Sequence, residues 1–164
     1  MTNPMKRLLA LLLSYASVEA KSIITEDYLD RVAMVESNYN YEAVGDKGKA
    51  IGAWQMHEAA FREACTYLAH REDALGREQW LEFSKDHKKY AKDASIGRLA
   101  CKAYLTILEK QMIKYKIKVT PISLYMAYNM GFQGAYDKYF DYKSYWLDSK
   151  RRSILARANT ILSR

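Results

Sequence analysis

The chain alternates between segments of helical periodicity and short polar breaks. The first periodic segment follows Thr25, where a threonine with acids in the next two positions is typical of a helix N-terminus, and it runs to about Ser37. Residues 42–56 combine three glycines with short apolar runs, which predicts a small β-hairpin and the only strands of the chain. From His57 onward, apolar residues recur every three or four positions, so we expect a second helix there.

Charged residues dominate positions 71–92. Trp80, Leu81 and Phe83 interrupt the charges, and we expect a solvated surface connector that contains one short helix. A long helix is predicted near 91–115, because its apolar residues fall on one broad stripe.

Thr120 and Pro121 form a clear helix start, with threonine as the N-cap and proline in the first helical position. The segment that follows is nearly all apolar, so this helix should be central and buried, with Gly131 as its C-terminal stop. Asp148 or Ser149 is expected to cap the last helix, and its inward-facing residues are predicted to be Ile154, Ala158 and Ile161. The sequence therefore predicts one mainly α domain with a small β-hairpin region.

The first twenty residues resemble a secretory signal peptide. A basic pair at 6–7 precedes an apolar run from Leu8 to Ala16, and Val18 and Ala20 suit a cleavage site. An amphipathic helix or an uncleaved anchor on a lipid surface are the alternatives; the run is too short to span a bilayer comfortably. We therefore expect a leader over 1–20, a catalytic domain over 21–164, and a secreted or periplasmic location.

The chain of 164 residues is the size of one domain, and its formal charge is +7. Removing residues 1–20 takes away two basic residues and one acid, so the remaining domain keeps a charge of +6. This favours an anionic partner, which could be nucleic acid, a membrane or an anionic cell wall. No compact basic run or nucleic-acid motif is present, so we expect no nucleic-acid partner. We also expect a monomer.

Cysteine and histidine usage points to no metal or cofactor. Cys65 and Cys101 could form a disulfide in an exported chain or remain buried apolar thiols, and the sequence favours neither. The three histidines, His57, His70 and His87, are scattered without ligand spacing. No metal or cofactor site is therefore expected.

Glu36 is the candidate for acid–base chemistry. It lies four and three positions after Val32 and Ala33, so a helix places its carboxylate on the apolar face. Burial raises a carboxyl pKa above its usual value of about 4.3, and a carboxyl that is protonated near neutral pH can act as a general acid. The alternative is a frayed last turn with Glu36 in water.

Two motifs resemble lysozyme-like glycosidases of the soluble lytic transglycosylase type. The first motif consists of Glu36-Ser37, Ala43-Val44, Gly48, Gly52 and Trp54-Gln55-Met56. The second is Ala127-Tyr128-Asn129-Met130-Gly131, preceded by a helix similar to the family's at Ile96-Gly97 and Tyr104-Leu105. Gly45-Asp46-x-Gly48 also resembles goose-type lysozymes, and the whole resemblance covers about residues 24–140.

The resemblance implies cleavage of the β-1,4 bond between N-acetylmuramic acid and N-acetylglucosamine in peptidoglycan. It implies that Glu36 is the acid, that Tyr128 contacts Glu36 or the substrate N-acetyl group, that Gln55 and Asn129 bind sugar substituents, and that Ser37 supports Glu36 or a sugar hydroxyl. The alternatives are core packing for Tyr128, capping or backbone hydrogen bonds for Gln55 and Asn129, and a helix-end hydroxyl for Ser37.

Three functional alternatives remain. In a lytic transglycosylase, Glu36 alone suffices, because the muramyl C6 hydroxyl attacks its own anomeric carbon. In a hydrolase, a second carboxylate activates water, and Asp46 is the candidate, although it also suits a turn residue. A non-catalytic wall-binding module is the third. Several aromatic residues could form sugar-stacking platforms, namely Tyr125, Tyr136, Tyr139 and Trp146.

Overall fold

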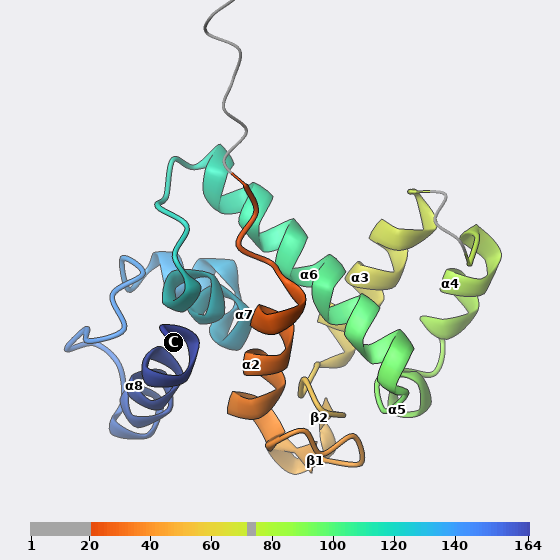
Figure 1. Cartoon of the computed structure of the whole chain (residues 1–164), viewed down its shortest axis with the longest axis horizontal. Helices are drawn as coiled ribbons and strands as arrows, with labels where there is room; N and C mark the ends of the chain where they lie inside the picture. The colour runs from red at the N-terminus through yellow and green to blue at the C-terminus, as the bar shows by residue number, and fades with distance from the viewer. Residues whose placement is uncertain (1–20, 72–74) are drawn as a thin grey trace, which may run out of the picture.

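The computed structural model describes residues 21–71 and 75–164, so the expected leader at 1–20 lies outside the described residues. The described chain is mainly helical with one small two-stranded antiparallel sheet, as predicted (Figure 1). In chain order the elements are α2 (Glu26–Ser37), β1 (Val44–Gly45), a 3-10 turn (Asp46–Gly48), β2 (Ala50–Ile51), α3 (Glu58–Ala69), α4 (Arg77–Phe83), α5 (His87–Tyr90), α6 (Ala94–Lys114), α7 (Pro121–Tyr136) and α8 (Ser149–Leu162).

The helices begin where local capping predicts. The Thr25 hydroxyl accepts a hydrogen bond from the Tyr28 amide at the start of α2. Thr120 and Ser123 form a reciprocal capping box at the start of α7. Asp148 caps α8, which settles the choice between it and the following serine.

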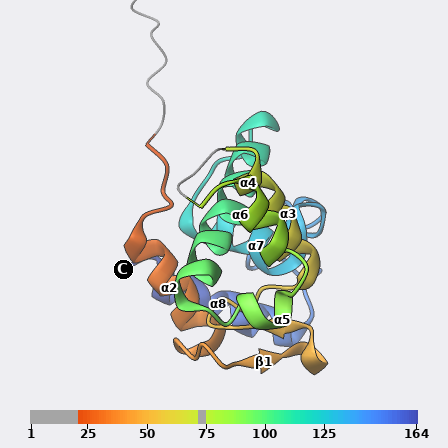
Figure 2. The same cartoon turned by 90° about the vertical axis from the view of Figure 1, so that its right-hand side faces the viewer.

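The helix α6 runs through the middle of the domain. It packs against α3 on one side and against α7 and α2 on the other (Figures 1 and 2). Its buried residues therefore occupy more than one face, among them Ala100, Ala103, Leu105 and Leu108. Its 21 residues make a rod of about 30 Å, long enough to connect the two sides of the fold.

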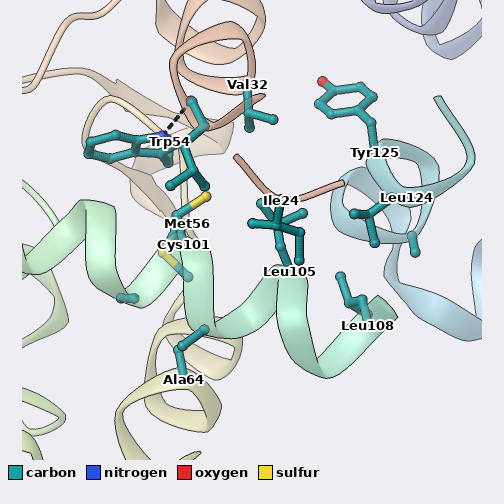
Figure 3. Close-up of a cluster of buried hydrophobic side chains, with 14 of the residues drawn as sticks. Ile24, Val32, Trp54, Met56, Ala64, Cys101, Leu105, Leu108, Leu124 and Tyr125 are labelled. Atoms are coloured by element: carbon teal, nitrogen blue, oxygen red, sulfur yellow. Dashed lines mark hydrogen bonds between the residues drawn. The ribbon is translucent and has the colours of Figure 1, made fainter. Parts of the chain in front are cut away.

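The core is a single apolar cluster around α6. Trp54, from the loop after β2, is 1% exposed, and its indole N–H donates to the Leu29 carbonyl of α2 at 3.0 Å (Figure 3). Cys65 and Cys101 are buried free thiols rather than a disulfide, and burial raises the pKa of the Cys65 thiol to about 12. The cysteines therefore serve as small apolar core residues.

The sheet is a short hairpin, and the turn that follows it packs against the end of α5. Val44 pairs with Ile51 and Gly45 with Ala50. Gly52 follows with a φ of +79°, and a Cβ at this position would lie 2.0 Å from the Ala91 carbonyl oxygen. Only glycine permits both the backbone conformation and this close approach.

Three expectations from the sequence need correction. The stretch around Trp80 is no mere solvated connector, because Trp80 is 0% exposed and α4 packs on α3. In α8 the core contains Leu155 and Leu162, whereas the predicted inward residues Ile154 and Ile161 are only half-buried. Gly131 breaks α7 with a φ of +75°, but helix resumes and continues to residue 136.

Candidate active site

Glu36 lies in the last turn of α2 with its carboxyl directed into the protein. Its Oε1 accepts a hydrogen bond of 2.8 Å from the Tyr125 hydroxyl. Burial raises the pKa of Glu36 from 4.5 to about 7; hydrogen bonds from Tyr125 and Asn129 and the charge of Arg157 act in the opposite direction. About half of the molecules therefore carry a protonated Glu36 near neutral pH, and the alternative of a frayed, solvated carboxylate is excluded.

Asn129 is held by charged groups on both sides. Its Oδ1 accepts from Arg151 Nη1 at 3.4 Å, which leaves the amide N–H group for Glu36. Tyr125 and Asn129 are four residues apart on α7, so both face the same way along this helix. One helical face of α7 thus supplies both hydrogen bonds to the acid.

Glu36 opens onto a cleft of about 690 Å³. The cleft is lined by the end of α2, the hairpin with the loop after it, the first turn of α3, Tyr104 of α6, the break in α7, and the start of α8. The lining residues that carry polar side chains are Glu36, Asp46, Gln55, His57, Tyr104, Tyr128, Asn129, Asp148, Lys150 and Arg151. The predicted residues Glu36, Asp46, Gln55, Tyr128 and Asn129 therefore share one cavity.

Gln55 forms part of the hairpin side of the cleft. Its backbone adopts a φ of 47°, and its Nε2 donates to the Gly52 carbonyl at 2.8 Å. A Cβ on Gly45 would lie 2.2 Å from the Gln55 Oε1, so the glycine makes room for this side chain. Gln55 is thus positioned by the turn that it closes.

Ser37 and Tyr128 both bind the loop after β2. The Ser37 hydroxyl donates to the Ala53 carbonyl at 2.8 Å, and the Tyr128 hydroxyl donates to the Trp54 carbonyl at 2.6 Å. The tyrosine that hydrogen-bonds Glu36 is therefore Tyr125, not Tyr128. The hydroxyls of Ser37 and Tyr128 both hold the loop after β2 in place.

Asp46 lines the cleft from the tip of the hairpin. Its backbone is left-handed with a φ of 45°, and its Oδ2 lies 3.4 Å from Nε2 of His57. Both side chains are more than half exposed. The residue is therefore a turn residue and a cleft residue at once, and the two interpretations from the sequence are compatible.

Three contributors to the site were not predicted from the sequence. Tyr125 was expected to be a sugar-stacking platform or a core residue; it is 0% exposed and its hydroxyl donates to Glu36. Arg157 donates to the Val35 carbonyl at 2.8 Å and brings its charge close to Glu36, and Arg151 holds Asn129. The i, i+4 spacing of Tyr125 and Asn129 could have indicated that the two side chains face the same site. No local sequence pattern indicates that α8 packs against α2.

The described residues contain no cluster of three or more His, Cys, Asp or Glu side chains that could hold a metal ion. Comparison with family models, with curated proteins and with solved structures finds no match for this chain.

Proposed function

We propose that this chain is a secreted or periplasmic glycosidase that cleaves the β-1,4 bond between N-acetylmuramic acid and N-acetylglucosamine in peptidoglycan, with Glu36 as its general acid. The observation that carries the proposal is the state of Glu36. Its pKa of about 7 keeps a proton available near neutral pH, and the same carboxyl lines an open cleft of about 690 Å³.

Cleavage of a glycosidic bond requires a proton on the leaving oxygen while positive charge develops at the anomeric carbon. A general acid is most effective when its pKa lies near the working pH. Glu36 meets this condition because burial disfavours its anion, while Tyr125 and Asn129 fix its orientation. Gln55 lies in the same cleft, where its amide suits a sugar N-acetyl or hydroxyl group.

The leading route is that of a lytic transglycosylase. After Glu36 protonates the leaving oxygen, the muramyl C6 hydroxyl attacks the anomeric carbon of its own sugar, and the Glu36 carboxylate accepts the hydroxyl proton. The product carries a 1,6-anhydro ring, and Glu36 returns to its protonated form. The alternative is hydrolysis, favoured by the presence of Asp46 in the same cleft, where its carboxylate would activate water.

The charge of the chain suits an anionic wall. The chain keeps a charge of +6 without its first twenty residues, which hold two basic residues and one acid against a total of +7. In the cleft itself, Lys150 and Arg151 lie beside Asp46 and Asp148. Wall polymers that carry carboxylates or phosphates would be attracted by this charge. The partner in this proposal is therefore the glycan strand together with its anionic substituents.

The test is turnover of purified peptidoglycan by the chain and by Glu36→Gln. We expect the variant to lose at least about 100-fold in rate, since it cannot donate the proton, while it still binds the wall in a pull-down assay. Glu78→Gln, at an exposed position in the first turn of α4, is the matched control and should keep full activity. Equal turnover by both variants would refute the role of Glu36.

Product mass separates the enzymatic routes. A 1,6-anhydro end, lighter than a reducing end by one water, identifies a transglycosylase. A reducing end identifies a hydrolase, and Asp46→Asn should then abolish turnover as well. Binding to the wall without cleavage by the unaltered chain would instead indicate the non-catalytic module.

A further inference from the structure

Apart from Val44 in the hairpin, the most exposed large apolar side chains of the described residues gather in one part of the sequence. They are mainly aromatic, namely Ile113, Tyr115, Tyr136, Tyr139, Tyr145 and Trp146, with Tyr115 54% and Tyr139 86% exposed. None of them lines the cleft that contains Glu36. Their exposure is therefore not explained by the proposed cleavage reaction.

Three aromatic rings in this region are in mutual contact, those of Tyr115, Phe132 and Tyr136, and together with the exposed Tyr139 they form what we call the aromatic surface. The ring of Tyr115 lies 5.3 Å from that of Phe132 and 6.2 Å from that of Tyr136. Tyr139 follows directly, with its amide bonded to the Tyr136 carbonyl at 2.9 Å. The last turn of α6 and the second half of α7 thus present one patch of tyrosines to solvent.

Exposed lysines lie beside this surface. Lys114 and Lys116 flank Tyr115, and Lys118 follows two residues later; all three are exposed. The sequence contains no Asp or Glu from position 110 to 136, and the nearest acids that follow are the exposed Asp137 and Asp141 beside Tyr136 and Tyr139. None of the three lysines forms an ion pair with another residue in the part of the chain that the structure describes. The positive charge is therefore available for an anionic partner.

We propose that the aromatic surface and its lysines dock on an anionic lipid bilayer. Tyrosine rings suit the headgroup region, because one end is apolar and the other can hydrogen-bond. Lysines near an anionic leaflet add attraction, and their long stems let the ammonium groups reach the phosphates. No described helix is long and apolar enough to cross a membrane, so this contact lies on the bilayer surface.

The position of the N-terminal segment supports this orientation. The buried Glu109 accepts hydrogen bonds from the Ser22 hydroxyl at 2.7 Å and from the Ile23 amide at 3.3 Å. Glu109 lies six residues before Tyr115 on α6, a rise of about 9 Å. Residues 1–20, with their apolar run at 8–16, therefore join the described chain at the same end of the domain as the aromatic surface.

The same orientation leaves the cleft accessible. Both views place the hairpin at the opposite end of the domain from the last turn of α6 (Figures 1 and 2). Asp46, Ala50 and Gln55 of the hairpin region line the cleft. A domain that rests on the bilayer through Tyr115 thus directs its hairpin away from the lipid. The docking itself does not depend on the proposed cleavage reaction.

The experiment is sedimentation of the full chain with vesicles of phosphatidylcholine alone or mixed with phosphatidylglycerol, at low salt. We expect binding only to the anionic vesicles, with loss at high salt because charges are screened. The double variant Lys114→Gln/Lys116→Gln should bind about 30-fold more weakly, at about fivefold for each lysine. Tyr115→Ser/Tyr139→Ser should also weaken binding, and thermal melting checks that both variants stay folded.

The matched control removes two exposed lysines from α5, which lies before the opposite end of α6. Lys88→Gln/Lys89→Gln loses the same charge, so it should keep most of the binding if the location of the lysines matters. Equal loss in both lysine pairs would show a general charge effect and would overturn the proposal. Binding that is unchanged in the Lys114/Lys116 and Tyr115/Tyr139 variants would assign it to other residues, including the N-terminal segment, and would overturn it too.

Discussion

Replacing Glu36 by glutamine should stabilise the fold, and the gain should depend on pH. The pKa of Glu36 rises from its ordinary value of 4.5 to about 7 on folding, chiefly because the carboxyl is buried. Glutamine has nearly the same shape and cannot ionise. Its Oε1 can still accept the hydrogen bond that the Tyr125 hydroxyl gives to the carboxyl.

The direction of the pH dependence follows from the protonation of Glu36 in the folded and the unfolded chain. Below pH 4.5 the carboxyl of Glu36 is protonated in both the folded and the unfolded chain, so the variant and the parent should be about equally stable. Between pH 4.5 and 7 the unfolded chain ionises first, and the parent loses stability as the pH rises. Above pH 7 the full difference is present, about 3 kcal/mol for this change in pKa.

Urea unfolding at pH 4 and pH 8 measures this difference. We expect Glu36→Gln to raise the free energy of unfolding by about 3 kcal/mol at pH 8 and by little at pH 4, with an unchanged m-value. In thermal melting this corresponds to a rise of about 6–12 °C at pH 8. The exposed control Glu78→Gln should show no such pH dependence. A gain for Glu36→Gln that is the same at both pH values would refute the burial argument.

Three further predictions concern the hydrogen bond to Glu36, the hairpin glycines and the loop after β2. Tyr125→Phe removes a hydrogen bond to the ionised form of Glu36, so the alkaline limb of the pH–rate profile should move up by about one to two pH units. Gly52→Ala should lower the free energy of unfolding by about 3 kcal/mol or more, because the added Cβ would lie 2.0 Å from a backbone oxygen. The matched variant Gly48→Ala should lower it by only about 1 kcal/mol, because Gly48 has a similar positive φ but open space around it. Ser37→Ala should lower stability by about 1 kcal/mol in urea unfolding, since its hydroxyl binds the loop that carries Gln55.

The starts of the helices could be predicted because capping is a local property. The side-chain oxygens of Thr25, Thr120 and Asp148 each accept a hydrogen bond from the amide three residues later. The sequence within that short window therefore contains the whole signal. The hairpin was predictable for the same reason, since its glycines lie within the turn that they permit.

Packing choices between neighbouring residues were harder to predict. In α8, isoleucine precedes leucine at positions 154–155 and again at 161–162, so two apolar series differ by one residue. Periodicity alone fits both, and only the neighbouring helices α2 and α7 decide that the leucines face the core. Trp80 posed the same difficulty, because its burial depends on α3, whereas its sequence neighbours are charged.

The residues that form hydrogen bonds with Glu36 lie far from it in the sequence. Tyr125 lies 89 residues from Glu36 and two residues before the start of the second motif, so a motif centred on Tyr128 directs attention to the wrong hydroxyl. The hydrophobic face of α7 places Tyr125 in the core, and a buried phenol must still find a hydrogen-bond partner. Because Tyr125 and Tyr128 are both buried phenols, each needs its own hydrogen-bond acceptor. In the structure these are the Glu36 carboxylate and the Trp54 carbonyl.

The site is organised as two pairs of adjacent residues. In α2, Glu36 faces the cleft while its neighbour Ser37 binds the Ala53 carbonyl; in α7, Asn129 faces the cleft while its neighbour Tyr128 binds the next carbonyl along the loop. Ser37 and Tyr128 thus fix the loop that carries Gln55, and Tyr128 lines the cavity as well. The relative position of Glu36, Gln55 and Asn129 therefore depends on two hydroxyl bonds to consecutive peptide groups. Ser37 and Tyr128 accordingly contribute to the geometry of the cleft through this loop.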